Sequence, residues 1–149
     1  MSIFPTPILL ATDGSEEAKL ATQAAIELSR ETGSELHVAY VLPTPAEMLG
    51  HHFYSAEIRE RLIGQAGEEA QAFLERQAEQ IRAEGGKVAD THLRTGEPDK
   101  EILRAAETLG VGTIVIGSRG LGAISRALMG SVSDSVVRHA HCPVFVVRQ

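Results

Sequence analysis

Residues 117–133 read GSRGLGAISRALMGSVS, in which Gly117 and Gly120 are followed, after nine residues, by Gly130 and Ser131. An apolar run typical of a buried strand, TIVI at 113–116, comes directly before this segment, and residues 132–139 are expected to form a helix. Glycine lets the backbone approach an anion closely, and the free N–H groups at a helix start favour negative charge. The segment therefore predicts a phosphate-binding loop, although glycine in tight turns after strands would explain the same spacing without a ligand.

The segment does not match the best-known phosphate loops. A Walker A loop needs Gly-x-x-x-x-Gly-Lys-Ser/Thr, which is absent. GLGAIS at 120–125 only approaches a dinucleotide fingerprint, because it ends in Ser and follows the fourth expected strand rather than the first. No nucleophile-elbow Gly-x-Ser-x-Gly occurs either. The sequence thus favours binding over catalysis.

Strands and helices are expected to alternate along the whole chain. We expect strands at 8–11, 36–41, 88–93, 113–116 and 144–147, and helices at about 15–33, 56–83, from 98 onward and at 132–139. This alternation predicts one α/β domain over residues 1–149, with an open, mainly parallel sheet covered by helices. We expect the more polar third strand at a sheet edge, a loop from Pro43 to about Tyr54, and a bent or loose first half of the long helix at Gly64 and Gly67.

Three residues should meet at one edge of this sheet. Asp13 follows the first strand, Val41 ends the second and Gly117 follows the fourth. Ligands of such sheets bind beyond the carboxyl ends of the strands. Asp13 could accept hydrogen bonds from ribose hydroxyls or help hold Mg²⁺, but Asp13 or Ser15 could equally cap the following helix.

Other polar residues near the glycines also have two interpretations. Ser131 and Ser133 lie where serine commonly caps a helix, and the same position serves phosphates. Arg119 lies inside the glycine loop and is the better phosphate candidate, whereas Arg126 is favoured as a solvated surface residue.

Composition narrows the class of protein. The formal net charge is −6 and no basic stripe follows any expected element, so we expect no nucleic-acid partner. The single cysteine, Cys142, cannot form an internal disulfide, which fits a reducing compartment. We find no secretory leader pattern and no apolar run near the ~20 residues of a membrane span. We therefore expect a cytoplasmic protein with no membrane partner.

The histidines give only weak signals. His139, His141 and Cys142 resemble a metal cluster, but further ligands at zinc-site spacing are missing, so we expect Cys142 to pack against the core. His51 and His52 are expected at the surface of the 43–54 loop.

The whole chain resembles the universal stress protein family. The glycine spacing at 117–133 fits the family's nucleotide motif without a gap. The turns TDGS at 12–15 and GEP at 96–98, and the ending HCPVFVV at 141–147, are also similar to that family. The resemblance implies a five-stranded sheet in the order 3-2-1-4-5 and an ATP site.

This resemblance also implies a role for each matching residue. Thr12, Asp13 and Val41 would lie near adenine and ribose, and Gly117 near the ribose and first phosphate. The residues that would surround the phosphates are Gly120, Gly130, Ser131, Val132 and Ser133, while Arg119 falls within the motif. The implied nucleotide-binding set is Thr12, Asp13, Val41, Gly117, Ser118, Arg119, Gly120, Gly130, Ser131, Val132 and Ser133. Mg²⁺ or Mn²⁺ would accompany the phosphates.

The family resemblance further implies a homodimer through the last strand, with Val144 and Val146 at the contact. The leading hypothesis is an ATP-binding stress or signalling protein with slow or no hydrolysis. A weak ATPase or a protein that phosphorylates itself on Ser131 or Ser118 remains an alternative, as does an interaction module that uses no nucleotide. Neither a general base nor a Walker-type lysine is evident, so no catalytic residue is assigned.

Overall fold

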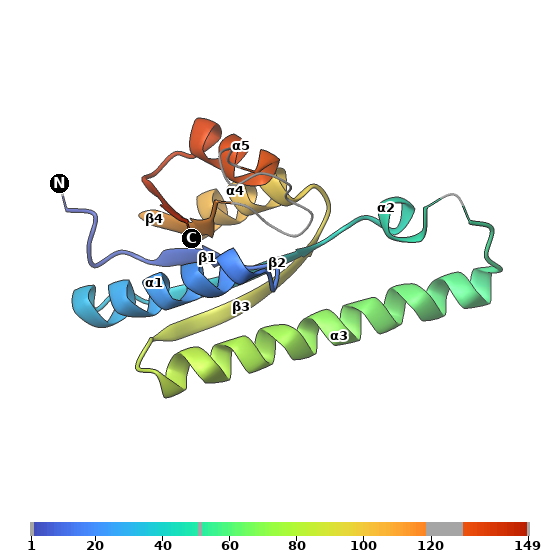
Figure 1. Cartoon of the computed structure of the whole chain (residues 1–149), viewed down its shortest axis with the longest axis horizontal. Coiled ribbons are helices and arrows are strands. Elements are labelled where there is room, and N and C mark those ends of the chain that lie inside the picture. Colours follow the sequence, from blue (N-terminus) through green and yellow to red (C-terminus); the bar gives the residue numbers. More distant parts are fainter. Residues whose placement is uncertain (1, 51, 119–129, 149) are drawn as a thin grey trace.

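The computed structural model describes residues 2–50, 52–118 and 130–148. Within them, five strands alternate with helices (Figure 1). The strands are β1 (Ile8–Ala11), β2 (Leu36–Leu42), β3 (Val88–Thr95), β4 (Thr113–Gly117) and β5 (Val144–Val147). The helices are α1 (Glu16–Thr32), α2 (Pro45–Leu49), α3 (Ala56–Ala83), α4 (Pro98–Leu109) and α5 (Ser131–His139).

All five strands belong to one parallel sheet in the order β3-β2-β1-β4-β5. This confirms the expected α/β class and the strand order that the family resemblance implied. The polar strand β3 is indeed at an edge, and it runs two residues further than expected, to Thr95. Because the chain leaves β1 toward β2 and leaves β4 toward β5, the strand order reverses between β1 and β4.

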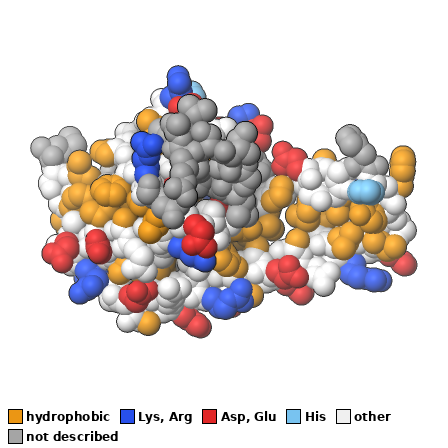
Figure 2. Space-filling model, viewed as in Figure 1, with side chains coloured by type: hydrophobic (Ala, Val, Ile, Leu, Met, Phe, Trp, Pro, Cys, Tyr) orange, Lys and Arg blue, Asp and Glu red, His pale blue; other side chains and the backbone are white. Residues whose placement is uncertain are grey.

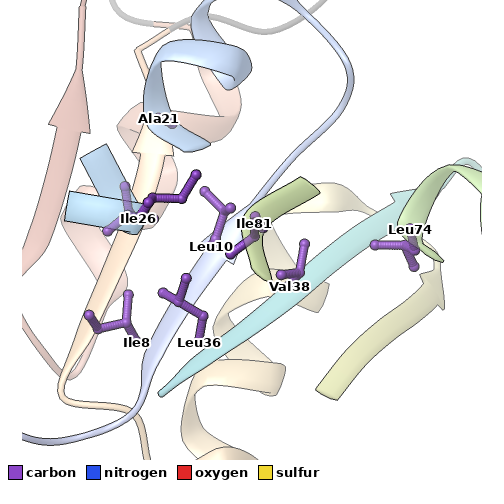
Figure 3. Close-up of a cluster of buried hydrophobic side chains, with 10 residues drawn as sticks. Ile8, Leu10, Ala21, Ile26, Leu36, Val38, Leu74 and Ile81 are labelled. Carbon is purple, nitrogen blue, oxygen red and sulfur yellow. The ribbon is translucent and has the colours of Figure 1, made fainter. Parts of the chain in front are cut away.

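Helices cover both faces of the sheet. Side chains alternate along a strand, so Leu10 packs on the face that carries α1 and α3, whereas its neighbour Leu9 packs on the face that carries α4 and α5. Figure 3 shows the first of these clusters, in which Leu10 and Val38 from the strands meet Ile26 of α1 and Leu74 of α3. Burying each such side chain stabilises the fold by about 1.5–3 kcal/mol.

The helix ends follow local sequence signals. The Ser15 hydroxyl caps α1 by accepting a hydrogen bond from the Ala18 amide (3.1 Å), and Gly33 ends the helix with φ of 75°. Pro98 occupies the first turn of α4, and Gly110 ends that helix with φ of 63°. Helix α1 thus ends as expected at Gly33, and α4 begins as expected at Pro98.

Two expectations about the segment between β2 and β3 are wrong. Residues 43–54 are not all loop, because a short helix, α2, begins after Thr44. The Thr44 hydroxyl and the Glu47 side chain cap each other's backbone amides there. Helix α3 is continuous over its 28 residues, so Gly64 and Gly67 do not interrupt it.

The first half of α3 extends beyond the sheet together with α2 (Figure 1). The first buried residue of α3 is Ala70, fourteen positions after its start at Ala56. Hydrophobic side chains gather on this projecting part (Figure 2), where Phe53 and Ile58 are exposed. No helix in the described part of the chain is long and apolar enough to cross a membrane.

Candidate functional site

The carboxyl ends of β1 and β4 lie next to each other where the strand order reverses. The register pairs Leu10 with Val115, so continuing it by two residues brings Thr12 level with Gly117. On the other side of β1, the Thr12 amide donates to the Ala39 carbonyl oxygen (3.0 Å). The topology therefore brings residues after β1, β2 and β4 to one edge, as expected, and this is where open α/β sheets bind ligands.

Asp13 shapes the turn between β1 and α1. Its Oδ1 accepts a hydrogen bond from the Ser15 amide (2.9 Å), and Gly14 follows it with φ of 81°. Ser15 rather than Asp13 is the helix cap, which resolves the alternative that the sequence left open. The Asp13 carboxylate is half-buried at the edge of the sheet.

Gly117 is required by packing against α1. A Cβ atom built at Gly117 would lie 2.9 Å from the main-chain carbonyl carbon of Glu17 and 3.0 Å from its oxygen. Such distances are too short for a carbon atom, so only glycine fits where the first turn of α1 crosses β4. Packing against α1 therefore explains why residue 117 is a glycine, independently of any contact between Gly117 and a ligand.

Hydrogen bonds join the start of α5 to the end of β4. The Gly130 amide donates to the Ser118 carbonyl oxygen (2.7 Å), and the Ser133 hydroxyl donates to the same oxygen and to the Gly130 carbonyl oxygen (3.1 Å). Gly130 occupies the cap position of α5 and supplies no side-chain cap. Ser131 is the first residue of the helix and not its cap, while the buried Ser133 hydroxyl joins helix to strand.

Val41 lies two residues beyond Ala39 in β2, toward the same edge of the sheet. It is half-buried and packs against the cluster beneath α4 and α5. Val132 packs against the same cluster from the first turn of α5. Both valines are thus on the α4–α5 face of the edge where Asp13 emerges.

The universal stress protein family model matches residues 6–148. The chain belongs to this family. It is 34% identical over 145 residues to the universal stress protein YxiE of Bacillus subtilis, covering 95% of this chain and 97% of the relative.

Solved structures agree with this assignment. The hypothetical protein MJ0577 superposes with a TM-score of 0.82 at 28% identity, over 99% of this chain and 98% of that one. The universal stress protein from Archaeoglobus fulgidus in complex with dAMP superposes with a TM-score of 0.67 at 28% identity, over 99% and 100% of the two chains.

A buried carboxylate of this universal stress protein was missed by the sequence reasoning. Glu17 lies in the first turn of α1, where an acidic residue favours the helix start, but it is 5% exposed and accepts a hydrogen bond from the Ser118 hydroxyl. Its position gives a signal that could have found it, because Glu17 precedes the buried Ala21 and Ala25 by four and eight residues. Glu17 therefore lies in the contact between α1 and β4.

The side chain of Tyr40 interacts electrostatically with Asp13 at the same edge of the sheet. Burial, and then the negative charge of Asp13, raise the pKa of the Tyr40 hydroxyl above its ordinary value. The Tyr40 ring also packs against Phe73 of α3, with ring centroids 5.3 Å apart. Asp13 is thus close enough to affect the side chain on the α1–α3 face of β2.

Arg119 and Gly120, which complete the predicted nucleotide set, lie outside the described residues, as do Arg126 and His51. The structure brings together the other nine members at one edge of the sheet. They are Thr12, Asp13, Val41, Gly117, Ser118, Gly130, Ser131, Val132 and Ser133.

The C-terminal histidines have structural contacts. His141 Nε2 lies 3.2 Å from the Val111 carbonyl oxygen, and Cys142 packs against the α4–α5 cluster, where burial raises the pKa of its thiol. His139, Ser135 and Asp99 also approach one another, but the Ser135 hydroxyl donates directly to Asp99 (2.7 Å). A catalytic triad needs the histidine between serine and aspartate, so this arrangement does not form one.

Proposed function

We propose that this universal stress protein binds ATP, together with Mg²⁺ or Mn²⁺, at the edge of the sheet between β1 and β4. The observation that carries the proposal is the start of α5. Gly130 caps this helix without a side chain, and the first amides of a helix have no partner within it. These amides, beginning with that of Ser131, are therefore suited to donate hydrogen bonds to phosphate oxygens.

The residues present fit an adenine nucleotide with its cation. The amides of Ser131, Val132 and Ser133, with the exposed Ser131 hydroxyl, offer donors to phosphates. Asp13 offers a carboxylate to ribose hydroxyls, and Val41 offers an apolar surface for a base. The bound cation would offset phosphate charge, which matters in a chain of net charge −6. The dAMP bound by the Archaeoglobus fulgidus relative supports an adenine nucleotide as ligand.

We propose a regulatory role for ATP, in which the nucleotide sets the conformation or partners of a cytoplasmic stress-response homodimer. The proposed dimer contact is β5, which is an edge strand of the sheet. Val144 and Val146 pack inward against the α4–α5 cluster, and Phe145 is the side chain that is 47% exposed. An apolar edge strand of this kind favours pairing with a second copy.

Gly130→Val tests the placement of the site. Gly130 has φ of −67° and ψ of 158°, which valine adopts readily, so we expect the variant to fold. The added side chain stands at the start of α5 and should abolish ATP binding measured by calorimetry. Gly64→Ala, in open space on α3, should bind ATP as the wild type does.

Two results would contradict the proposal. One is undiminished ATP affinity in folded Gly130→Val. The other is a wild-type protein that carries no ATP or ADP in mass spectra after purification and binds added ATP no more tightly than about 1 mM, or −4.1 kcal/mol.

One contact favours self-phosphorylation as a second candidate function. The Ser118 hydroxyl donates to the Glu17 carboxylate, which could accept its proton while the serine oxygen attacks the terminal phosphorus and ADP leaves. Mass spectrometry after incubation with ATP would then show one added phosphoryl group on Ser118, lost in Glu17→Gln. An unmodified wild-type protein that still binds ATP would leave the regulatory proposal standing alone.

A further inference from the structure

Two histidines from neighbouring strands meet on the α4–α5 face of the sheet. His37 of β2 lies opposite Asp90 in the register, and His92 of β3 lies opposite Ala39, so the two histidines are diagonal neighbours. Their facing ring nitrogens, His37 Nδ1 and His92 Nε2, are 2.9 Å apart. The ring centroids are 5.1 Å apart and the planes are tilted by 37°. Both side chains are half-buried and reachable from solvent.

We propose that His37 and His92 form a binding site for a divalent transition-metal ion of the Cu²⁺ or Ni²⁺ class. Imidazole nitrogens bind such ions at roughly 2.0–2.1 Å. Two nitrogens at that distance from one ion are about 2.9 Å apart when they subtend 90°, and about 3.3 Å apart at a tetrahedral angle. The observed 2.9 Å therefore matches neighbouring ligands of a square-planar or tetragonal ion better than those of tetrahedral zinc.

The two ring nitrogens that face each other are also the ones that would bind the ion. A hydrogen bond between the rings uses the same two nitrogens as the ion, so the ion replaces that bond. Asp90 adds negative charge near the pair, whereas Arg94 opposes it with positive charge.

The site has two protein ligands. No group of three or more His, Cys, Asp or Glu residues that could hold an ion occurs in ranges 2–50, 52–118 and 130–148, so water completes the coordination. Cu²⁺ should bind more tightly than Ni²⁺, following the general order of divalent affinities. His37 is the second residue of β2, whereas the proposed nucleotide edge lies at the other end of that strand. A negative result for metal binding would therefore not affect the proposal that a nucleotide binds at the other end of the strand.

Titration calorimetry with Cu²⁺ and Ni²⁺ on protein without an affinity tag tests the site. We expect one equivalent to bind, and His37→Gln or His92→Gln to weaken binding by about tenfold or more. The matched controls His52→Gln and His139→Gln remove histidines elsewhere and should leave the affinity unchanged. Circular dichroism checks that each variant is folded.

A measurement on the unaltered chain keeps the test independent of those variants. Substoichiometric Cu²⁺ should broaden the ring NMR signals of His37 and His92 before those of any other histidine. Equal affinity in the wild type and a folded double variant, His37→Gln with His92→Gln, would overturn the site. Broadening that begins at His139 or His141 would overturn it as well.

Discussion

Replacing Gly117 with alanine places a methyl group where α1 crosses β4. The new Cβ atom would lie 2.9 Å from the Glu17 carbonyl carbon, 3.0 Å from its oxygen and 3.1 Å from its Cβ. Carbon atoms prefer separations of about 3.5–4.0 Å, so these atoms must move apart. The two nearest atoms belong to the backbone of a helix whose Ala21 and Ala25 are fully buried, so rotation of a flexible side chain cannot relieve the contact.

We therefore expect Gly117→Ala to lower the free energy of unfolding by about 1–3 kcal/mol, the usual effect of overpacking. At roughly 2–4 °C per kcal/mol for a chain of this size, Tm should fall by about 2–12 °C. Urea unfolding followed by circular dichroism measures the change. Gly64→Ala is the control, because its Cβ meets no atom within 4 Å. It should stabilise the helix by up to about 1 kcal/mol. Wild-type stability in Gly117→Ala would refute the described packing of α1 on β4.

Three further variants test local features. Ser15→Ala removes the hydroxyl that caps α1 and should lower the free energy of unfolding, measured in urea, by about 0.5–2 kcal/mol. An unchanged free energy of unfolding would contradict this role of Ser15. The pKa of His92 is lower in the folded protein than in the unfolded chain. When the pH falls below the ordinary pKa of histidine, the unfolded chain therefore binds more protons than the folded protein does. His92 thus makes the free energy of unfolding decrease as the pH falls. His92→Gln should flatten that decline between about pH 7 and pH 5, and an unchanged slope would argue against it. Asp13→Asn should lower the pKa of Tyr40 in an ultraviolet titration, but only in part because burial is the larger cause.

The sequence predicted the sheet because its evidence is local. Apolar β-branched runs such as residues 113–116 are bounded by turn residues, and Ser15 and Gly33 mark helix ends by their own conformational preferences. Helix α2 was missed although its signal is also local. The prolines at 43 and 45 were interpreted as loop formers, while Thr44 and Glu47 form a capping box around Pro45.

Features that depend on distant parts of the chain were harder to predict. Gly64 costs a helix only about 1 kcal/mol, which the buried second half of α3 offsets. The edge that gathers Asp13, Val41 and Gly117 followed from topology alone. The burial of Glu17 against Ser118 did not, because it requires knowing how closely α1 approaches β4.

We propose that an adenine nucleotide binds at the edge of the sheet between β1 and β4. An NMR titration of the ¹⁵N-labelled protein with ATP and Mg²⁺ tests it most directly, because each backbone amide reports separately. We expect the largest shifts at the amides of Asp13 and of the first turn of α5, from Ser131 to Ser133. Largest shifts along β3 and α3, or no shifts at millimolar ATP, would contradict it.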